Sequence, residues 1–332
     1  MKAMQKVPVT ILTGFLGAGK TTLLGRILKE RHGERIAVIE NEFGEEGIDN
    51  ELLFTGGAEQ IVEMNNGCIC CTVRGDLVRL LGDLRARRER DPDAFGRVII
   101  ETTGLADPAP VAQTFFIDEE IAAHYRLDAV ITVVDALHAG AQLDAHHEAQ
   151  EQVGFADRIL VSKADLVGPE DERLLRQRLR RINRRAPIVP AHFGEVALAE
   201  VLDIHGFALD DILAIEPGFL GEESHEHDDA VQSFAFRSDT PLDPERLQAF
   251  FRAALREHGP ALMRYKGIVA FPGMAHRVVF QGVHMMMGSD IGSPWREGEA
   301  RESRLVFIGR DLPRDELLAA LQACRASVSP RA

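Results

Sequence analysis

The order of apolar and polar positions in the first two hundred residues predicts a mostly parallel sheet covered by helices. Short apolar runs rich in β-branched residues alternate there with longer segments of helical periodicity. The predicted strands are 9–13, 36–40, 98–101, 129–134, 159–162 and 188–190, and the predicted helices include 20–31, 74–90, 137–152 and 170–184. In the second of these helices, leucines at 77, 80, 81 and 84 form one apolar face.

The pattern changes after residue 215 and predicts a second, smaller domain. Residues 216–230 (EPGFLGEESHEHDDA) lack periodicity and contain Pro, Gly and acidic residues, which is typical of a linker or an exposed loop. Beyond it, strands are predicted at 231–238, 262–271, 277–287 and 304–310, and helices at 243–258 and 314–325. We therefore expect an α/β domain at 1–215, a linker at 216–230, and an α+β domain at 231–332 with a mostly antiparallel sheet and helices on one face.

Length, composition and charge limit the classes of protein to which this chain can belong. A length of 332 residues fits two domains, and 45% apolar with 27% charged residues is typical of a globular chain. The 38 basic and 52 acidic residues give a net charge of −14, which argues against a general binder of nucleic acids or membrane surfaces. The sequence has no apolar stretch of the ~18 residues that a membrane span needs and no recognisable signal peptide, so we expect a soluble, cytoplasmic protein.

A phosphate-binding loop is predicted between the first strand and the first helix. The segment VTILTGFLGAGKTTLL places Gly14, Gly19, Lys20 and Thr21 in P-loop spacing, after a strand and before a helix. Glycines let backbone N–H groups and the helix N-terminus approach the phosphates closely. We expect Lys20 to reach the β and γ phosphates and Thr21 to bind Mg²⁺, which predicts a P-loop NTPase fold.

The segment Ser162-Lys163-Ala164-Asp165 predicts which base is bound. This segment lies at the end of a predicted strand, at the edge of the sheet where the P-loop is also expected. Asp165 can accept hydrogen bonds from N1–H and the exocyclic amine of guanine, whereas adenine offers an acceptor at N1. Lys163 is expected along the base plane, and a backbone N–H near His192 can meet the guanine O6. An ordinary surface turn at the end of a strand is the alternative.

Two acidic segments lie between these motifs, at 40–46 (ENEFGEE) and 101–104 (ETTG). We assign Glu101 to the Mg²⁺ shell and Gly104 to a loop that senses the γ-phosphate. Glu42 has three candidate roles: binding Mg²⁺ directly, orienting the attacking water, or facing the cysteines. A solvated loop is the alternative for any single glutamate of the first segment.

Three of the four cysteines, Cys68, Cys70 and Cys71, cluster just before a predicted helix. The positive end of that helix favours thiolates. Three thiolates with a fourth exchangeable ligand suit Zn²⁺, and three alone suit Cu(I). Buried structural cysteines or a redox pair are the alternatives. His225 and His227 form either a second, loose metal site or part of a polar loop.

In this order, the segments GFLGAGKTTLL, ENEFGEEGID, NNGCICC, ETTGLADP and SKAD resemble the CobW-like GTPases, relatives of the urease and hydrogenase nickel-insertion GTPases. The likeness covers nearly the whole chain. It implies a slow GTPase that acts as a metallochaperone, with zinc delivery prominent in the family and cobalt- or nitrile-hydratase-related roles in other branches. It implies nucleotide roles for residues 14–22, which include Gly17, Ala18 and Thr22, for Glu101 and for residues 162–165, and a metal role for the three clustered cysteines.

We therefore expect a protein that hydrolyses GTP to GDP with Mg²⁺, binds zinc at the cysteines and transfers it to a client metalloprotein. Lys20, Thr21, Glu42 and Glu101 are the expected catalytic residues, and Glu42 is also an expected zinc ligand in the GTP state. The C-terminal domain is expected to face the client or to form a homo-oligomer. The alternatives are a metal-buffering protein that retains a nucleotide, a cobalt-related insertion GTPase and an ATP-dependent small-molecule kinase.

Overall fold

The structure is a computed structural model that describes residues 6–30, 33, 35–40, 60–63, 72–206, 230–296 and 298–326, with the backbone alone for 60–63 and 72–74. These residues fall into two compact units. The first holds the described residues up to Gly206 except Arg180–Arg185, and the second holds Arg180–Arg185 and the described residues from Ala230 onward. The expected linker at 216–230 lies outside the described residues except for Ala230, so its limits stay a prediction.

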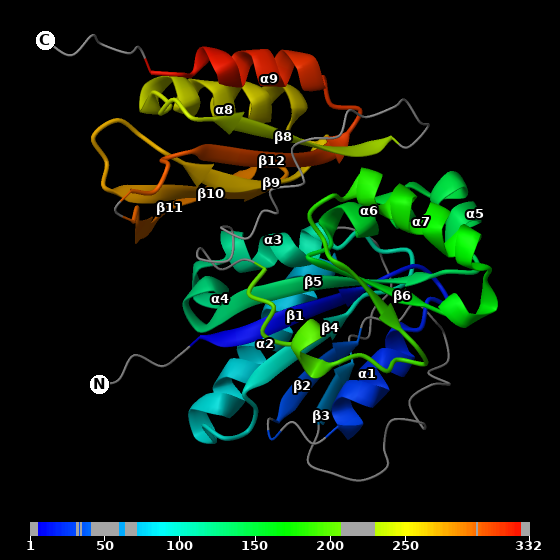
Figure 1. Ribbon diagram of the computed structural model, residues 1–332. Coiled ribbons are helices and arrows are strands. Elements are labelled where there is room, and N and C mark those ends of the chain that lie inside the picture. Colours follow the sequence, from blue (N-terminus) through cyan, green and yellow to red (C-terminus); the bar gives the residue numbers. More distant parts are fainter. Residues whose placement is uncertain are drawn as a thin grey trace, which may run out of the picture. The chain divides into compact units, whose positions relative to one another are not determined.

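A parallel sheet forms the centre of the first unit, as predicted (Figure 1). In the described part of the chain it has seven strands in the order β3-β2-β4-β1-β5-β6-β7, and each pair of neighbours is parallel. The strands are β1 (Val7–Thr13), β2 (Ile36–Glu40), β3 (Gln60–Glu63), β4 (Arg97–Glu101), β5 (Tyr125–Asp135), β6 (Arg158–Ser162) and β7 (Ile188–Ala191). The inner strands are buried almost throughout, which explains why they read as continuous apolar runs.

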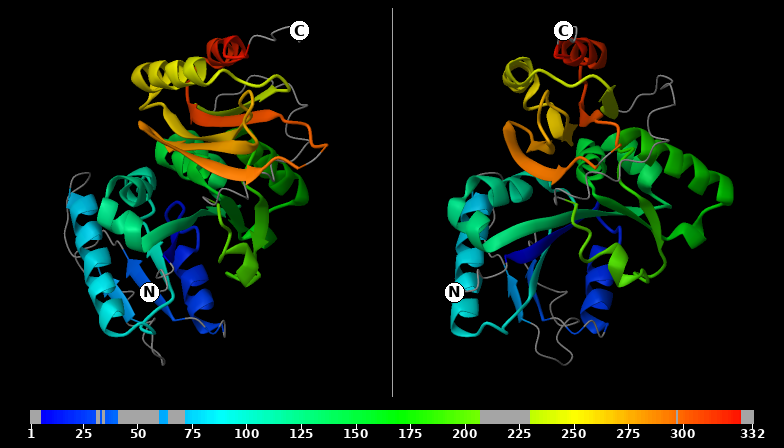
Figure 2. Two further views of the ribbon diagram at one scale, coloured as in Figure 1. Left: turned by 90° about the vertical axis from the view of Figure 1, so that its left-hand side faces the viewer. Right: turned by 60° about the vertical axis from the view of Figure 1, so that its left-hand side comes forward.

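Helices cover both faces of this sheet. They are α1 (Lys20–Lys29), α2 (Thr72–Arg90), α3 (Ala109–Ile117), α4 (Glu119–His124), α5 (Ala139–Ala145), α6 (His147–Phe155) and α7 (Pro169–Ile182). Helix α1 lies on one face and α2, α3 and α4 on the other (Figure 2). The predicted leucine stripe of α2 is buried as expected.

Two predictions for this unit need correction. The single helix predicted at 137–152 is two helices, because His146 between them is extended, with φ −131° and ψ 118°. Its ring lies 4.7 Å from that of Phe15, centroid to centroid, so the break lets α5 and α6 meet the P-loop. Strand β3 is not predicted at all: it has four residues and lies at the edge of the sheet, where the apolar pattern is weakest.

The second unit is the predicted antiparallel sheet with helices on one face (Figure 1). Its strands follow the order β11-β10-β9-β12-β8, and all neighbours are antiparallel. The elements are β8 (Val231–Ser238), α8 (Pro244–His258), β9 (Leu262–Val269), β10 (His276–Val283), β11 (Met286–Pro294), β12 (Ser303–Arg310) and α9 (Arg314–Ala323). Phe251 of α8 stacks on Phe280 and also packs near Phe307, so aromatic rings fill this core.

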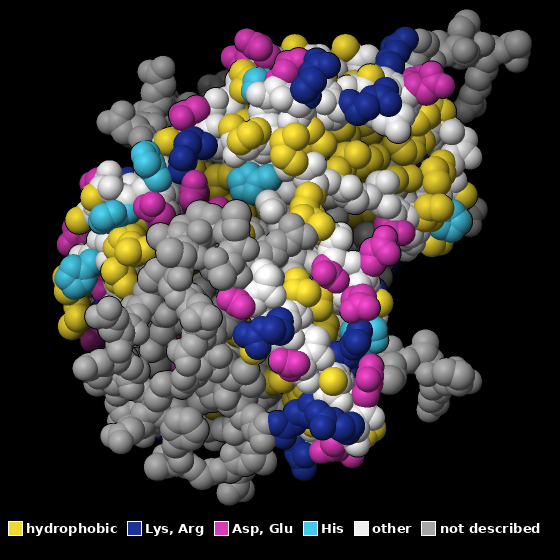
Figure 3. Space-filling model, turned by 180° about the vertical axis from the view of Figure 1, so that it is seen from behind, with side chains coloured by type: hydrophobic (Ala, Val, Ile, Leu, Met, Phe, Trp, Pro, Cys, Tyr) yellow, Lys and Arg dark blue, Asp and Glu magenta, His cyan; other side chains and the backbone are white. Residues whose placement is uncertain are grey.

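Residues 277–287, predicted as one strand, instead contain most of β10, the turn after it and the first residues of β11. His284 has a positive φ of 50°, and the chain turns there from β10 into β11. Met285, Met287 and Ile291 of this hairpin are among the exposed large apolar side chains. On the face seen in Figure 3, hydrophobic side chains gather over the second unit. Such exposed apolar surface is typical of regions that bind partners.

Candidate nucleotide-binding site

The predicted P-loop connects β1 to α1. Its glycines Gly14, Gly17 and Gly19 have positive φ values of 140°, 73° and 103°, which residues with a side chain rarely adopt. A Cβ on Gly14 would lie 2.2 Å from the backbone oxygen of Val133 on β5. The loop therefore needs glycine both for its conformation and for its close contact with the neighbouring strand.

Lys20, Thr21 and Glu101 lie together at the start of α1. The Lys20 side chain is nearly fully buried, and its ammonium donates a hydrogen bond of 2.8 Å to the carbonyl oxygen of Gly14. Burial lowers the pKa of Lys20, and the negative charge of Glu101 opposes that shift. Thr21 donates from its hydroxyl to the Glu101 carboxylate at 3.0 Å. The structure thus brings together three residues that the sequence assigns to phosphate and Mg²⁺ binding.

The segment after β4, which we call the β4–α3 loop (residues 102–108), lies against the P-loop. Thr102 donates from its backbone N–H to the Leu12 carbonyl and from its hydroxyl to that of Thr13, both at 2.9 Å. A Cβ on Gly104 would lie 2.6 Å from the backbone nitrogen of Leu16. The loop expected to sense the γ-phosphate is therefore packed directly on the P-loop.

The residues predicted to bind guanine also meet the P-loop. The Ser162 hydroxyl donates to the Ala18 carbonyl at 2.7 Å, and the Lys163 ammonium donates to the Gly17 carbonyl at 2.8 Å. Lys163 has a positive φ of 55°, which turns the chain sharply at the end of β6. These two hydrogen bonds hold the end of β6 against the P-loop.

Asp165 lies next to the end of β7, as the guanine assignment requires. Its carboxylate is partly exposed and lies 3.3 Å from Nδ1 of His192, the first residue after β7. The structure therefore brings Asp165 and His192 to one place, although their contact with a base stays a prediction. Thr22, the remaining P-loop residue of the expected set, is exposed in the first turn of α1.

Asp135 belongs to this site and is not among the predicted residues. It ends β5, its side chain is buried, and its Oδ2 accepts a hydrogen bond of 2.7 Å from the Lys163 ammonium and lies 2.9 Å from Nδ1 of His138. Burial alone would raise the pKa of Asp135, but the hydrogen bonds from Lys163 and His138 outweigh it and hold the pKa below its ordinary value. The available signal was an acidic residue at a strand end, as in Glu101.

The expected zinc ligands and the two histidines of the second candidate metal site lie outside the described residues. These are Cys68, Cys70, Cys71 and Glu42, together with His225 and His227. Helix α2 begins at Thr72, the residue that follows the cysteines in sequence. Within the described ranges, no group of three His, Cys, Asp or Glu side chains is arranged to hold a metal ion. The metal site therefore stays a prediction from the sequence.

A glycine-rich loop with a buried lysine, set between a parallel strand and a helix, defines a P-loop nucleotide-binding protein. Residues 8–190 match the family model described as CobW/HypB/UreG, nucleotide-binding domain, and residues 231–325 match the cobalamin synthesis protein cobW C-terminal domain. The chain belongs to this CobW family. The predicted resemblance is thereby confirmed.

Curated relatives and a solved structure agree with this assignment. The chain is 42% identical to the zinc chaperone YjiA of Escherichia coli over 97% of its own length and 100% of that protein. It is 34% identical to the zinc chaperone CobW of a Sinorhizobium species, over 96% and 97% of the two chains. The crystal structure of Zn(II)-bound YjiA GTPase from E. coli aligns with a TM-score of 0.78, 36% identity, and coverage of 97% and 100%.

One structural observation bears on the expectation that the chain does not cross a membrane. Among the helices of the described residues, none is long and apolar enough to span a bilayer.

Proposed function

We propose that this protein is a GTP hydrolase that couples its nucleotide state to the transfer of zinc to a client metalloprotein. The observation that carries the hydrolase part is the contact of 3.0 Å between the Thr21 hydroxyl and the Glu101 carboxylate, directly beside the buried Lys20. A lysine, a hydroxyl and a carboxylate at the start of a P-loop helix are the groups that nucleotide hydrolysis needs.

The oxygen atoms of Thr21 and Glu101 fit a magnesium ion, because Mg²⁺ prefers carboxylate and hydroxyl ligands and keeps several waters. Bound there, Mg²⁺ would neutralise charge on the phosphate oxygens. Lys20 would donate to the β and γ phosphates in place of its present bond to Gly14. Backbone N–H groups of the P-loop would stabilise the charge that develops as water attacks the γ-phosphorus.

Guanine selectivity is proposed to come from Asp165, supported by the bonds that tie the end of β6 to the P-loop. The Ser162–Ala18 and Lys163–Gly17 hydrogen bonds hold the end of β6 beside the P-loop. They would thereby set the distance between the proposed base and phosphate sites. Because adenine lacks the two donors that Asp165 would accept from, ATP should bind more weakly than GTP.

Zinc is the proposed cargo, and Cys68, Cys70 and Cys71 are its proposed ligands, with Glu42 as an additional ligand in the GTP state. Two relatives that align over nearly the whole chain are named zinc chaperones. A relative in Schizosaccharomyces pombe, 36% identical over 64% of this chain and 53% of its own, is named a zinc-regulated GTPase metalloprotein activator. These names support both the cargo and a metalloprotein client.

Phosphate release from GTP tests the hydrolase assignment. We expect the wild-type protein to hydrolyse GTP with Mg²⁺ in preference to ATP, and Lys20→Ala to lower the rate by about 10²–10³-fold, the range seen when one charge-stabilising donor is lost. Lys29→Ala, at the exposed end of the same helix, should keep the wild-type rate. A wild-type rate no higher than that of Lys20→Ala, or a preference for ATP, would refute the proposal.

A further inference from the structure

A buried glutamine that has no role in the steps above bridges two carbonyl groups of the β4–α3 loop. Gln152 of α6 is 1% exposed, and its Nε2 donates hydrogen bonds of 3.1 Å to the Gly104 oxygen and 3.0 Å to the Ala106 oxygen. Both partners are acceptors only, so the carboxamide must present its NH₂ group to them. A single buried side chain therefore ties two carbonyl groups of this loop to α6.

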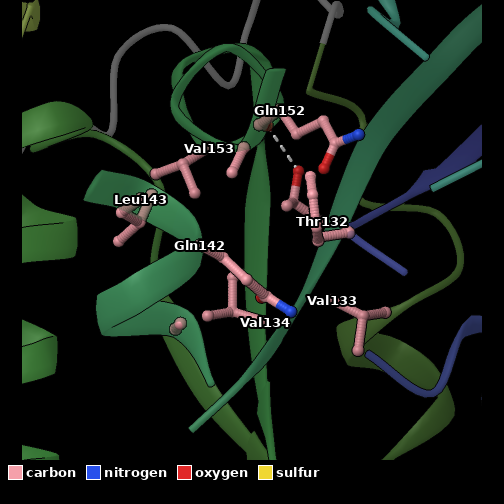
Figure 4. Close-up of a pocket in the computed structure, with 10 residues that line it drawn as sticks. Thr132, Val133, Val134, Gln142, Leu143, Gln152 and Val153 are labelled. Carbon is pink, nitrogen blue, oxygen red and sulfur yellow. Dashed lines mark hydrogen bonds between the residues drawn. The ribbon is translucent and has the colours of Figure 1, made fainter. Parts of the chain in front are cut away.

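Gln152 is itself fixed to the strand that contacts the P-loop. Its backbone carbonyl accepts a buried hydrogen bond of 2.6 Å from the Thr132 hydroxyl on β5, drawn as a dashed line in Figure 4. The next strand residue, Val133, contacts the P-loop at Gly14, where a Cβ would come within 2.2 Å of its oxygen. Strand β5 thus joins Gln152 to the P-loop through two adjacent residues.

The P-loop and α6 meet again at the other end of the helix. Phe15 packs its ring 4.7 Å from that of His146, which precedes α6. A small pocket lies between these contacts, lined by Phe15, by β5 and by side chains of α5 and α6 that include Gln142 and Gln152 (Figure 4). The position of α6 relative to the P-loop is therefore set at both ends of the helix.

From these contacts we infer that Gln152 is a positioning residue for GTP hydrolysis: its carboxamide holds the carbonyls of Gly104 and Ala106 so that the β4–α3 loop stays beside the P-loop. This inference rests on the proposed function. GDP lacks the γ-phosphate, so under the proposed function its binding depends on the P-loop and on the Ser162–Asp165 segment, and not on the β4–α3 loop. Loss of the Gln152 donors should therefore impair hydrolysis and recognition of the γ-phosphate while leaving GDP binding intact.

A second buried glutamine of α6 provides a matched control, which separates a positioning role of Gln152 from a role in stability alone. Gln150 is also buried, and its Nε2 donates a hydrogen bond of 2.8 Å to the Leu143 carbonyl in α5. Replacing either glutamine by methionine keeps the length of the side chain and removes a buried donor. Both variants should therefore lose stability, and only Gln152→Met removes the bonds to the β4–α3 loop.

The test compares full-length wild type, Gln152→Met and Gln150→Met in kcat and KM for GTP, in Kd for GDP and a nonhydrolysable GTP analogue, and in thermal unfolding. For Gln152→Met we expect kcat to fall about 10–100-fold with GDP Kd within about threefold, because a displaced positioning group acts on the rate. The affinity of the GTP analogue relative to GDP should fall too. Gln150→Met should keep the wild-type kcat and the wild-type affinity ratio.

Three results would overturn the inference: a wild-type kcat in Gln152→Met, an equal loss of affinity for GDP and the GTP analogue, or failure of Gln152→Met to fold where Gln150→Met folds. If the wild-type protein itself hydrolyses no GTP, the proposed function fails and this inference with it. If the wild type and Gln152→Met are equally active, only the role of Gln152 is refuted.

Discussion

Gly104→Ala tests whether the β4–α3 loop must lie against the P-loop. An alanine Cβ at this position would lie 2.6 Å from the backbone nitrogen of Leu16 and 2.8 Å from its Cα. Ordinary van der Waals contact begins at 3.4 Å, so the two segments must separate by 3.4 − 2.6 Å, or about 0.8 Å. The Cβ would also lie 2.7 Å from Cδ2 of the Leu16 side chain. A change of rotamer can relieve that contact, but it does not relieve the two contacts with the Leu16 backbone.

The size of this displacement sets the expected effect. A shift of about 1 Å in a group that positions reactants costs on the order of 10²-fold in rate, and the overpacking itself costs about 1–3 kcal/mol of stability. The P-loop is also held by Lys20 and Ser162, so the β4–α3 loop should move away from it. We therefore expect kcat for GTP to fall about 100-fold, with GDP affinity changed by less than about fivefold.

Phosphate release at saturating GTP and titration with a fluorescent GDP derivative measure the two quantities. Gly82→Ala is the control, because its Cβ would meet no atom within 4 Å and the residue lies inside helix α2. That variant should keep the wild-type kcat and gain about 0.5–1 kcal/mol of stability. A wild-type kcat in Gly104→Ala would refute the reasoning, as would equal losses of kcat and GDP affinity.

Three further predictions follow from side chains of the first unit. Asp165→Asn should shift preference from GTP toward xanthosine triphosphate, because the amide donates where the carboxylate accepts; undiminished GTP binding in a competition assay would remove the base assignment. Asp128→Ala should destabilise the protein by about 3 kcal/mol in urea unfolding, because it removes the fully buried partner of the Arg97 guanidinium and leaves that group the half-exposed carboxylate of Asp203; a loss below about 1 kcal/mol would contradict this. Asp135 has a pKa below its ordinary value, so its stabilising contribution should be present at neutral pH and lost as pH falls through that lower value. The stability difference between wild type and Asp135→Asn should then shrink below about pH 4, and a difference that stays constant to pH 3 would refute the assignment.

The parts of the fold that depend on local pattern could be predicted from the sequence. Strand β2 has its predicted bounds, Ile36–Glu40, because an uninterrupted apolar run ends there at a polar residue. The P-loop is predicted because glycine, lysine and threonine have fixed roles at fixed spacing. By contrast, the break at His146 depends on a contact with Phe15, which lies more than a hundred residues earlier in the chain.

The same distinction applies to the site. Lys20, Thr21 and Glu101 carry motif signals, and the structure places them together. Gln152 carries no such signal, and Asp135 carries only the weak one of an acidic residue at a strand end. The roles of both arise from hydrogen bonds to segments that the fold brings near, namely the β4–α3 loop and Lys163. In the sequence of a helix, a buried glutamine cannot be told from an exposed polar residue. Its hydrogen bonds to a distant loop are therefore not predictable from the pattern.

The affinity for zinc in the two nucleotide states tests the central claim most directly. Competition with a chromophoric chelator gives the Zn²⁺ Kd of the reduced protein with GDP and with a nonhydrolysable GTP analogue, and a variant with serine at Cys68, Cys70 and Cys71 shows whether those thiols form the site. We expect tighter binding in the GTP state by about 5–150-fold, which corresponds to a coupling of about 1–3 kcal/mol. By linkage, zinc must change the preference for GTP over GDP by the same factor. Equal zinc affinities in both states would contradict GTP-driven delivery and favour a metal-buffering protein that merely retains a nucleotide.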